Sequence, residues 1–513
     1  MKIKKLIAAV PAVCLLLAAF GTIHVGAVDA GTVTSGAVVE VYSGQKLQST
    51  TEYGSPAEAW TRTVSSADSS SETVITLGAD WNEDEILTIK SGQHITLDLN
   101  GHYVKRSRNY SLKSDGAVFH INSSGVFTLR DSNPKSKGYD GVKGGVITGG
   151  ASSNTGGGVH IDEDGEFRME GGTIYDCITD EDGGAVYLDG SSMNTKFTMT
   201  GGRIYGCKTI DSANECYGGA IYLRKGTVAI SNAKIDDCYS EDDGGAIYSE
   251  RGKITLNNVI FSGNKCREKG GAIYIAHDTA KYQATLLHVY DCIFAGNQAE
   301  EDGGAVFIND NAENNEAVLF HNCQFRNNNA AGYGGAIYVN DDNIALSSCE
   351  ITANRAGQPG GGVFVDCRYD ITLKGQMIIK DNFSEKGKGV SNLALDNGTL
   401  GTSHVINGGL YKNSIVHVGS TASKSVLLSE WMSQYQAKYF AADEGTLMFH
   451  EQRVVEAPMI VTASLFSEGG FKAVIILGSV GVIGTIILII RKKSTHKAVQ
   501  GNEEAVQGGE END

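Results

Sequence analysis

The sequence has little proline, five residues in 513, and its 65 glycines follow no Gly-X-Y period. A collagen triple helix needs that period together with abundant proline, so a collagen-like rod is excluded. Glycine still makes up about one residue in eight, against roughly 7% in an average protein. Because glycine permits tight turns and close backbone approach, the composition predicts a chain with many turns.

The sequence also lacks a basic stretch outside its two ends. Asp and Glu total 60 against 43 Lys and Arg, which gives a formal net charge of −17. Nucleic-acid binding depends on neutralising a row of phosphates, so we expect no nucleic-acid partner. There is no Cys-x-x-Cys pair either, and on that ground we expect no zinc site.

The two ends have the patterns of export and membrane segments. Residues 1–30 combine a basic start, an apolar run and small residues for cleavage, which predicts a secretory signal peptide. Residues 473–490 are uncharged and long enough to cross a bilayer as one helix. The basic triplet that begins at Arg491 follows at once. It predicts a cytoplasmic tail at 491–513 and an extracellular body, anchored in the cell membrane by a single pass.

Between these segments, the phrase Gly-Gly-[Ala/Gly]-[Ile/Val]-aromatic-aliphatic recurs every 26 to 35 residues. Upstream of each copy after the first lies a second phrase, [Ile/Phe]-x-x-[Asn/Cys]. From this Asn or Cys to the second glycine is seven residues in five coils, for example from Asn264 to Gly271. A distance fixed in this way indicates a structural register.

The shortest repeat, residues 245–270, contains three short β-branched or aromatic segments separated by turn residues. Three strands in about 26 residues form one coil of a parallel β-helix, whose coils stack about 4.8 Å apart. We therefore predict an all-β, right-handed parallel β-helix of roughly ten to thirteen coils over residues 72–425. A β-propeller would need about 40 residues and four strands per blade.

Two flanking segments are expected to cover the ends of the rod. Residues 31–71 form the predicted N-terminal cap, with a short amphipathic helix around Trp60. Residues 426–472 form the predicted C-terminal cap and the linker to the membrane segment.

Strand parity predicts what faces outward. In each glycine-pair phrase, the Ile or Val and the next-but-one aliphatic residue should face inward, and the Ala and the aromatic residue outward. The outward aromatic residues would stack as an aromatic ladder that begins at His160. The ladder residues after His160 are the predicted ligand-binding residues: Tyr187, Tyr222, Tyr248, Tyr274, Phe307, Tyr338 and Phe364.

The Asn or Cys of the second phrase is predicted to form a structural ladder at a bend, where short side chains satisfy turn backbone groups. Its members are Cys177, Cys207, Cys238, Asn264, Asn297, Asn328, Asn354 and Asn382. A second cysteine column contains Cys292, Cys323 and Cys349. Buried thiols explain both columns better than disulfides. Cys216, Cys266 and Cys367 lie outside the columns and could pair or react.

The pairing of GGA[IV] with FxxN resembles the repeat of the chlamydial polymorphic membrane proteins, surface adhesins with a β-helical passenger. Six copies of the first motif and three of the second match, over roughly residues 150–390. That family ends in an outer-membrane β-barrel, whereas here one predicted helix and a basic triplet follow the repeats. The chain is more similar to right-handed β-helix surface proteins of Gram-positive gut bacteria, whose early coils carry phrases like LGADW and ITLDLNGH. This resemblance implies a Gram-positive cell surface.

Right-handed β-helices also include pectate lyases and polygalacturonases, so the fold alone leaves catalysis open. The Gly-His-Gly and Arg-Ile-Lys phrases of polygalacturonases are absent. Three acidic triplets, ending at Asp182, Asp243 and Asp302, occupy the same position in the repeat, just before a glycine pair. They are the candidate calcium ligands, and calcium is the one possible cofactor. No general base can be named beside them.

The sequence therefore favours a non-catalytic adhesin that binds a glycan or a host or cell-surface protein through the aromatic ladder. A polysaccharide lyase or glycoside hydrolase on the same fold is the first alternative. A structural envelope spacer is the second.

Overall fold

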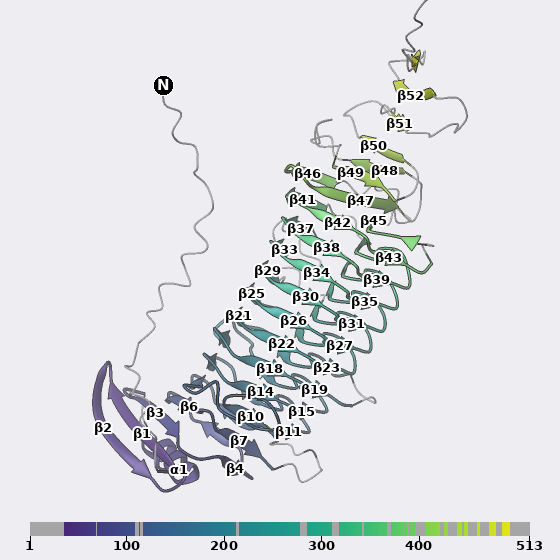
Figure 1. Ribbon diagram of the computed structural model, residues 1–513. Helices are drawn as coiled ribbons and strands as arrows, with labels where there is room; N and C mark the ends of the chain where they lie inside the picture. The colour runs from purple at the N-terminus through teal and green to yellow at the C-terminus, as the bar shows by residue number, and fades with distance from the viewer. Residues whose placement is uncertain are drawn as a thin grey trace, which may run out of the picture.

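The computed structural model describes residues 35–443, apart from 68, 108–111, 113–115, 212–214, 277–284, 310–317, 341–342, 367–370, 387–388, 396–405, 421–424 and 429–438. It also describes four strands farther along the chain, at 446–449, 459–461, 471–478 and 485–492. The predicted signal peptide at residues 1–30 and the tail from residue 493 lie outside these ranges. Figure 1 shows a long rod of stacked coils, with β1, β2 and α1 at one end.

One side of the rod is a 16-stranded sheet, here called sheet A, which is parallel from β3 onward. Its strands are β2 (Lys46–Tyr53), β1 (Ala37–Ser43), β3 (Glu72–Leu77), β6 (His94–Asp98), β9 (Val126–Arg130), β13 (Glu166–Met169), β17 (Lys196–Met199), β21 (Thr227–Ser231), β25 (Lys253–Asn257), β29 (Leu286–Tyr290), β33 (Val318–His321), β37 (Ile344–Ser347), β41 (Ile371–Gly375), β46 (Ile406–Leu410), β48 (Ser425–Leu428) and β50 (Thr446–Phe449).

A 24-stranded sheet, sheet B, consists of two parallel ladders that join near the C-terminal end of the rod. The glycine-pair ladder contains β5 (Leu87–Ile89), β8 (Phe119–Ile121), β12 (Val159–Ile161), β16 (Val186–Leu188), β20 (Ile221–Leu223), β24 (Ile247–Ser249), β28 (Ile273–Ile275), β32 (Val306–Ile308), β36 (Ile337–Val339), β40 (Val363–Val365) and β45 (Leu393–Leu395). The other ladder contains β4 (Trp81–Glu83), β7 (Tyr103–Arg106), β10 (Val146–Thr148), β14 (Thr173–Tyr175), β18 (Arg203–Tyr205), β22 (Lys234–Asp236), β26 (Ile260–Ser262), β30 (Ile293–Ala295), β34 (Gln324–Arg326), β38 (Glu350–Thr352), β42 (Ile378–Lys380), β47 (Ile415–Ser420) and β49 (Phe440–Ala442).

A third sheet, sheet C, adds a two-residue strand to each coil, which the three-strand prediction did not include. It contains β11 (Ala151–Ser152), β15 (Ile178–Thr179), β19 (Lys208–Thr209), β23 (Tyr239–Ser240), β27 (Lys265–Cys266), β31 (Gln298–Ala299), β35 (Asn329–Ala330), β39 (Arg355–Ala356), β43 (Phe383–Ser384) and the antiparallel β44 (Gly389–Val390). In the described residues, nine coils thus have a parallel strand in every sheet. The fold is the predicted all-β parallel β-helix.

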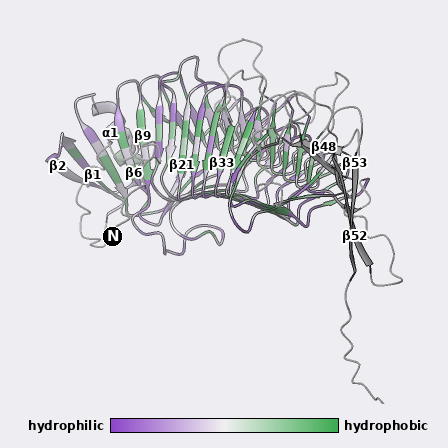
Figure 2. Ribbon diagram, turned by 90° about the horizontal axis from the view of Figure 1, so that it is seen from above, coloured by the Kyte–Doolittle hydropathy of each residue, from purple (hydrophilic) through white to green (hydrophobic). Residues whose placement is uncertain are grey.

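The interior of the rod is one continuous apolar core. In the coil of β24 to β27, Ile247, Ile254, Leu256 and Phe261 are fully buried, and equivalent residues follow in the neighbouring coils. Figure 2 shows strands such as β21 and β33 carrying both hydrophobic and hydrophilic residues, as expected when one side of each strand faces the core. Ala246 corrects the parity prediction, because it is buried in the core. It precedes β24, so strand alternation does not apply to it.

The glycine pairs make the turn into each glycine-pair strand, and their two members have different requirements. Gly244 has a φ of +68°, a left-handed conformation that side-chain-bearing residues rarely adopt. Gly245 has no such φ, but a Cβ there would lie 2.3 Å from the carbonyl oxygen of Gly271 in the next coil. Close stacking therefore requires glycine at both positions.

The five asparagines of the predicted structural ladder lie in one column inside the rod and are at most 1% exposed: Asn264, Asn297, Asn328, Asn354 and Asn382. The side-chain oxygen of Asn297 accepts from both the backbone and side-chain nitrogens of Asn264, each at 3.1 Å. Its side-chain nitrogen donates to Asn328 Oδ1 at 3.0 Å and to the Phe261 carbonyl at 3.1 Å. The same contacts recur in successive coils, so each amide links its coil to both neighbours.

Cysteine takes the same position in the earlier coils, at Cys177, Cys207 and Cys238. All eight cysteines in the described ranges are buried thiols, including Cys216 and Cys266. Burial raises the pKa of Cys238 to about 12 and that of Cys216 to about 11. Cys367 lies outside the described residues.

The N-terminal end of the core is covered by α1 (Pro56–Ser66), the predicted helix around Trp60. Ser55 caps it, accepting a hydrogen bond from the Glu58 backbone nitrogen at 3.2 Å. The Trp60 ring packs 5.9 Å from Trp81 and 5.8 Å from Phe119, between ring centroids. The β1–β2 hairpin, which pairs antiparallel with β3, was not predicted. It covers the edge that the first parallel strand would expose.

The apolar run near the C-terminus contains strands where a helix was predicted. β52 (Phe471–Gly478) and β53 (Thr485–Lys492) pair antiparallel, and β51 (Met459–Val461) joins them. The run is rich in β-branched residues and interrupted by glycine, which favours strands over a helix. None of the helical structure in the described ranges combines the length and apolar character that crossing a bilayer requires.

Candidate functional site

The aromatic ladder lies on the glycine-pair strands, outside the main core, as a cluster of its own. Its rings are stacked face to face from Tyr187 to Phe364, with centroids 4.7–5.4 Å apart and ring planes within 20° of parallel. Parallel pairing in exact register, such as Tyr222 with Tyr248, aligns them. The stacking is therefore a direct consequence of the repeat.

The rings are only 3–8% exposed, which corrects the expectation of an open aromatic face. Neighbouring ladder rings stack on both faces of each ring from Tyr222 to Tyr338, and two further tyrosines pack against the column. Tyr217 packs 4.3 Å from Tyr248, and Tyr333 packs 4.5 Å from Phe364, between centroids. A sugar ring has no free aromatic face on which to stack within this ladder. Whether the ladder residues contact a ligand stays a prediction.

The three candidate calcium ligands lie in alternate coils, each just before a glycine pair. Each carboxylate accepts a hydrogen bond from the backbone of the next coil: Asp182 from Tyr217 at 2.9 Å, Asp243 from Lys269 at 2.9 Å, and Asp302 from Tyr333 at 2.7 Å. Two coils separate successive members, roughly 10 Å at strand spacing. The structure does not bring the three together in one group.

Asp243 is buried, and Asp182 and Asp302 are partly buried. Burial raises the pKa of Asp182 and of Asp243 to about 7, although the backbone hydrogen bond to each works in the opposite direction. Burial also raises the pKa of Asp302. Because the same carboxylate-to-amide bond recurs at three places, it belongs to the repeat and not to a single catalytic centre.

Polar residues lie two positions after every ring of the ladder except Tyr274, where Ala276 takes this place; this row is here called the polar column. Backbone hydrogen bonds from coil to coil keep it in register. It contains Asn122, Asp162, Asp189, Arg224, Glu250, Asn309, Asn340 and Asp366. Tyrosine hydroxyls of the ladder donate to it one coil on: Tyr222 to Glu250, and Tyr338 to Asp366 at 3.1 Å. The ladder thus presents phenol–carboxylate pairs at its rim.

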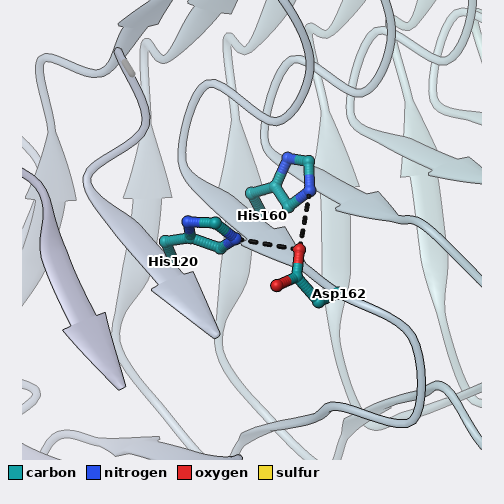
Figure 3. Close-up of side chains that lie close together, drawn as sticks. All are labelled: His120, His160 and Asp162. Carbon is teal, nitrogen blue, oxygen red and sulfur yellow. Dashed lines mark hydrogen bonds and ion pairs between the residues drawn. The ribbon is translucent and has the colours of Figure 1, made fainter. Parts of the chain in front are cut away.

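At its N-terminal end the aromatic column changes from tyrosine to histidine. His120 on β8 pairs in register with His160 on β12, which pairs in register with Tyr187. The imidazoles pack edge to face with centroids 4.8 Å apart. Figure 3 shows both rings directed at Asp162: Oδ1 lies 2.9 Å from His120 Nε2 and 3.4 Å from His160 Nε2.

The site is open on one side, because the three side chains are 22–32% exposed. Thr155 Oγ1 lies 2.9 Å from His160 Nδ1, so this second ring nitrogen is also engaged. Burial alone would raise the pKa of Asp162, but its hydrogen bonds to His120 and His160 outweigh burial and hold it well below its usual value. The carboxylate is therefore ionised at neutral pH.

His160 was predicted from the sequence as a member of the aromatic ladder, but the group that it forms with His120 and Asp162 was not predicted. The sequence feature that could have revealed this group is the similarity of FHINSSG at 119–125 to VHIDEDG at 159–165. The coil of His120 lacks the glycine-pair phrase, so it was not aligned with the others. The expectation of no zinc site considered cysteine pairs only and did not test imidazole and carboxylate ligands.

Comparison with known proteins agrees with this architecture. The family described as right handed beta helix region matches residues 94–376, more than half of the chain. No curated protein and no solved structure matches it. The matched residues contain the whole of the described ladder up to Phe364 and the histidine group. With its stacked parallel coils, the chain belongs to the right-handed β-helix family.

Proposed function

We propose that this protein is a membrane-anchored cell-surface adhesin whose β-helix is a rigid, non-catalytic binding rod. The observation that carries the proposal is the polar column beside the ladder. There, Glu250 and Asp366 accept hydrogen bonds from ladder tyrosines, and the Glu250 side chain remains 35% exposed. The stacked rings fix the positions of these two carboxylates, which lie four coils apart along the rod.

The chemistry of this row favours a neutral glycan as the ligand. Ionised carboxylates and amide oxygens accept hydrogen bonds from sugar hydroxyls, and a carboxylate has room for more than one donor. The net charge of −17 disfavours an anionic polymer. A basic host or cell-surface protein is the alternative ligand, because it would complement the same charges.

The apolar run at 473–490 and the basic triplet after it support the membrane anchor. The structure pairs parts of this run as the strands β52 and β53. In a bilayer, a single run of this length would instead satisfy its backbone hydrogen bonds within a helix. The basic residues would remain on the cytoplasmic side. The signal peptide pattern at 1–30 supports export of the β-helix to the outer surface. The resemblance to β-helix surface proteins of Gram-positive gut bacteria supports a Gram-positive cell.

A polysaccharide lyase or glycoside hydrolase is the second candidate, favoured by one observation. Asp243 has a pKa raised by burial to about 7, a value suited to a general acid or base. Its repeat in alternate coils and its bond to the Lys269 amide point instead to coil stacking.

Screening the full detergent-solubilised chain on a glycan array, with released sugars measured in the same wells, separates these functions. Retention of a neutral glycan without release of reducing or unsaturated ends is expected. Release of such ends would establish the enzyme, and the absence of all glycan binding would refute the proposal in its glycan form.

A further inference from the structure

The group formed by His120, His160 and Asp162 differs from the other polar contacts of the rod. Two imidazole nitrogens from successive coils contact the same carboxylate oxygen, at 2.9 and 3.4 Å. Within the described ranges, this is the one group of three such side chains whose ligand atoms all lie within 4.8 Å of one another. By contrast, His102 pairs with Asp80 alone, at 3.0 Å.

We propose that His120 Nε2, His160 Nε2 and Asp162 Oδ1 bind one divalent transition-metal ion. Ligand atoms about 2.1 Å from an ion lie roughly 3.0 Å apart at octahedral angles and about 3.4 Å apart at tetrahedral angles. The two measured separations match this range. The third separation, between the imidazole nitrogens of the two histidines, is within 4.8 Å, so all three atoms already lie close enough together to face one ion.

The ligand types select the class of metal. Imidazole nitrogen suits zinc, iron, copper and nickel, whereas calcium and magnesium prefer oxygen ligands throughout. Two histidines and one carboxylate also leave at least one coordination position for water or a ligand atom. Partial exposure of all three side chains gives the ion access from solvent.

The surrounding structure holds the ligands in place. In-register pairing of β8 and β12 fixes the distance between the histidines. Asp162 follows His160 by two residues, just beyond the end of β12, and its Oδ1 lies 3.4 Å from His160 Nε2. Thr155 engages His160 Nδ1 and leaves Nε2 for the metal, the usual task of a residue behind a ligand. A bound ion would cross-link two successive coils at the histidine end of the ladder.

Zinc titration of the full chain, purified in detergent without a histidine tag and stripped with chelator, tests this proposal. Calorimetry is expected to show one zinc ion per chain, and cobalt substitution should give visible absorption bands. His120→Gln and His160→Gln should each weaken zinc binding at least about 100-fold, and Thr155→Val about 10-fold. Calcium at millimolar concentration should not displace the zinc.

His102→Gln is the matched control, because it removes an imidazole from a His–Asp pair outside the group. It should bind zinc as the parent does. Asp162→Asn preserves side-chain shape and should also lose zinc binding; circular dichroism establishes that each variant is folded. Failure of the parent to bind zinc, unchanged affinity in folded His120→Gln or Asp162→Asn, or equal loss in His102→Gln would overturn the proposal.

Discussion

Replacing Asn297 with alanine should destabilise the rod far more than a typical surface substitution. Its side chain makes four buried hydrogen bonds of 3.0–3.1 Å, to Asn264, Asn328 and the Phe261 carbonyl. Alanine would leave the backbone N–H of Asn264 without its acceptor. It would also remove one partner from the Asn264 side-chain amide and one from the Phe261 carbonyl.

The Asn328 side-chain oxygen would lose one donor as well, and the magnitude follows from these four losses together. A buried polar group deprived of its partner costs about 1–3 kcal/mol, which suggests roughly 4 kcal/mol for the substitution. An unfolding entropy of about 2.1 cal/mol/K per residue, over roughly 350 residues, gives about 0.7 kcal/mol/K. The expected fall in Tm is therefore about 5 °C.

Thermal unfolding followed by circular dichroism measures this shift, and Asn340→Ala is its control. Asn340 donates one partly buried hydrogen bond, to Asn309 at 2.7 Å, so its loss should lower Tm by about 1 °C. Equal shifts in the two variants, or no shift in Asn297→Ala, would show that the amide column does not hold the coils together.

Three further predictions concern the ladder, the aspartates and the thiols. Tyr248→Ala should cost about 3–5 kcal/mol in unfolding free energy, because it opens a gap in the stack, whereas Tyr248→Phe should cost under about 1 kcal/mol; denaturant titration compares them. The pKa of Asp243 is raised from 3.8 to about 7, so the folded state holds its proton more tightly and stability should fall between about pH 4 and 7. Asp243→Asn keeps an acceptor for the Lys269 amide and should flatten that slope in melts across pH; an unchanged slope would contradict the assignment. Cys216 and Cys238 should resist alkylation at pH 8 until denaturant is added, as mapped by mass spectrometry, and rapid labelling in the native state would contradict their burial.

The parallel β-helix could be predicted because the spacing within the repeat is fixed from coil to coil. A seven-residue distance between Asn264 and Gly271 can recur only if successive coils superimpose, and apolar alternation in the strands identifies the inward face. The short strands of sheet C could not be found in this way. A two-residue strand such as β27 (Lys265–Cys266) carries no periodicity.

The candidate site was harder to predict from the sequence than the fold, for two physical reasons. Parity places Tyr248 outside the core but does not show that its neighbours cover both ring faces, because that depends on exact coil-to-coil register. The histidine group needs His120 and His160 to be aligned across coils with different turns. Forty residues separate them along the chain, although they are adjacent in space.

Affinity for the array-selected glycan, measured with rim variants of the full chain, tests the proposed binding surface most directly. Glu250→Gln and Asp366→Asn retain an acceptor for the ladder hydroxyls but remove the charges, so the double variant should bind at least about tenfold more weakly. Glu350→Gln, an exposed change on β38 in the other ladder of sheet B, should bind as the parent does. Equal affinity in all three proteins would contradict the assignment of ligand binding to the polar column.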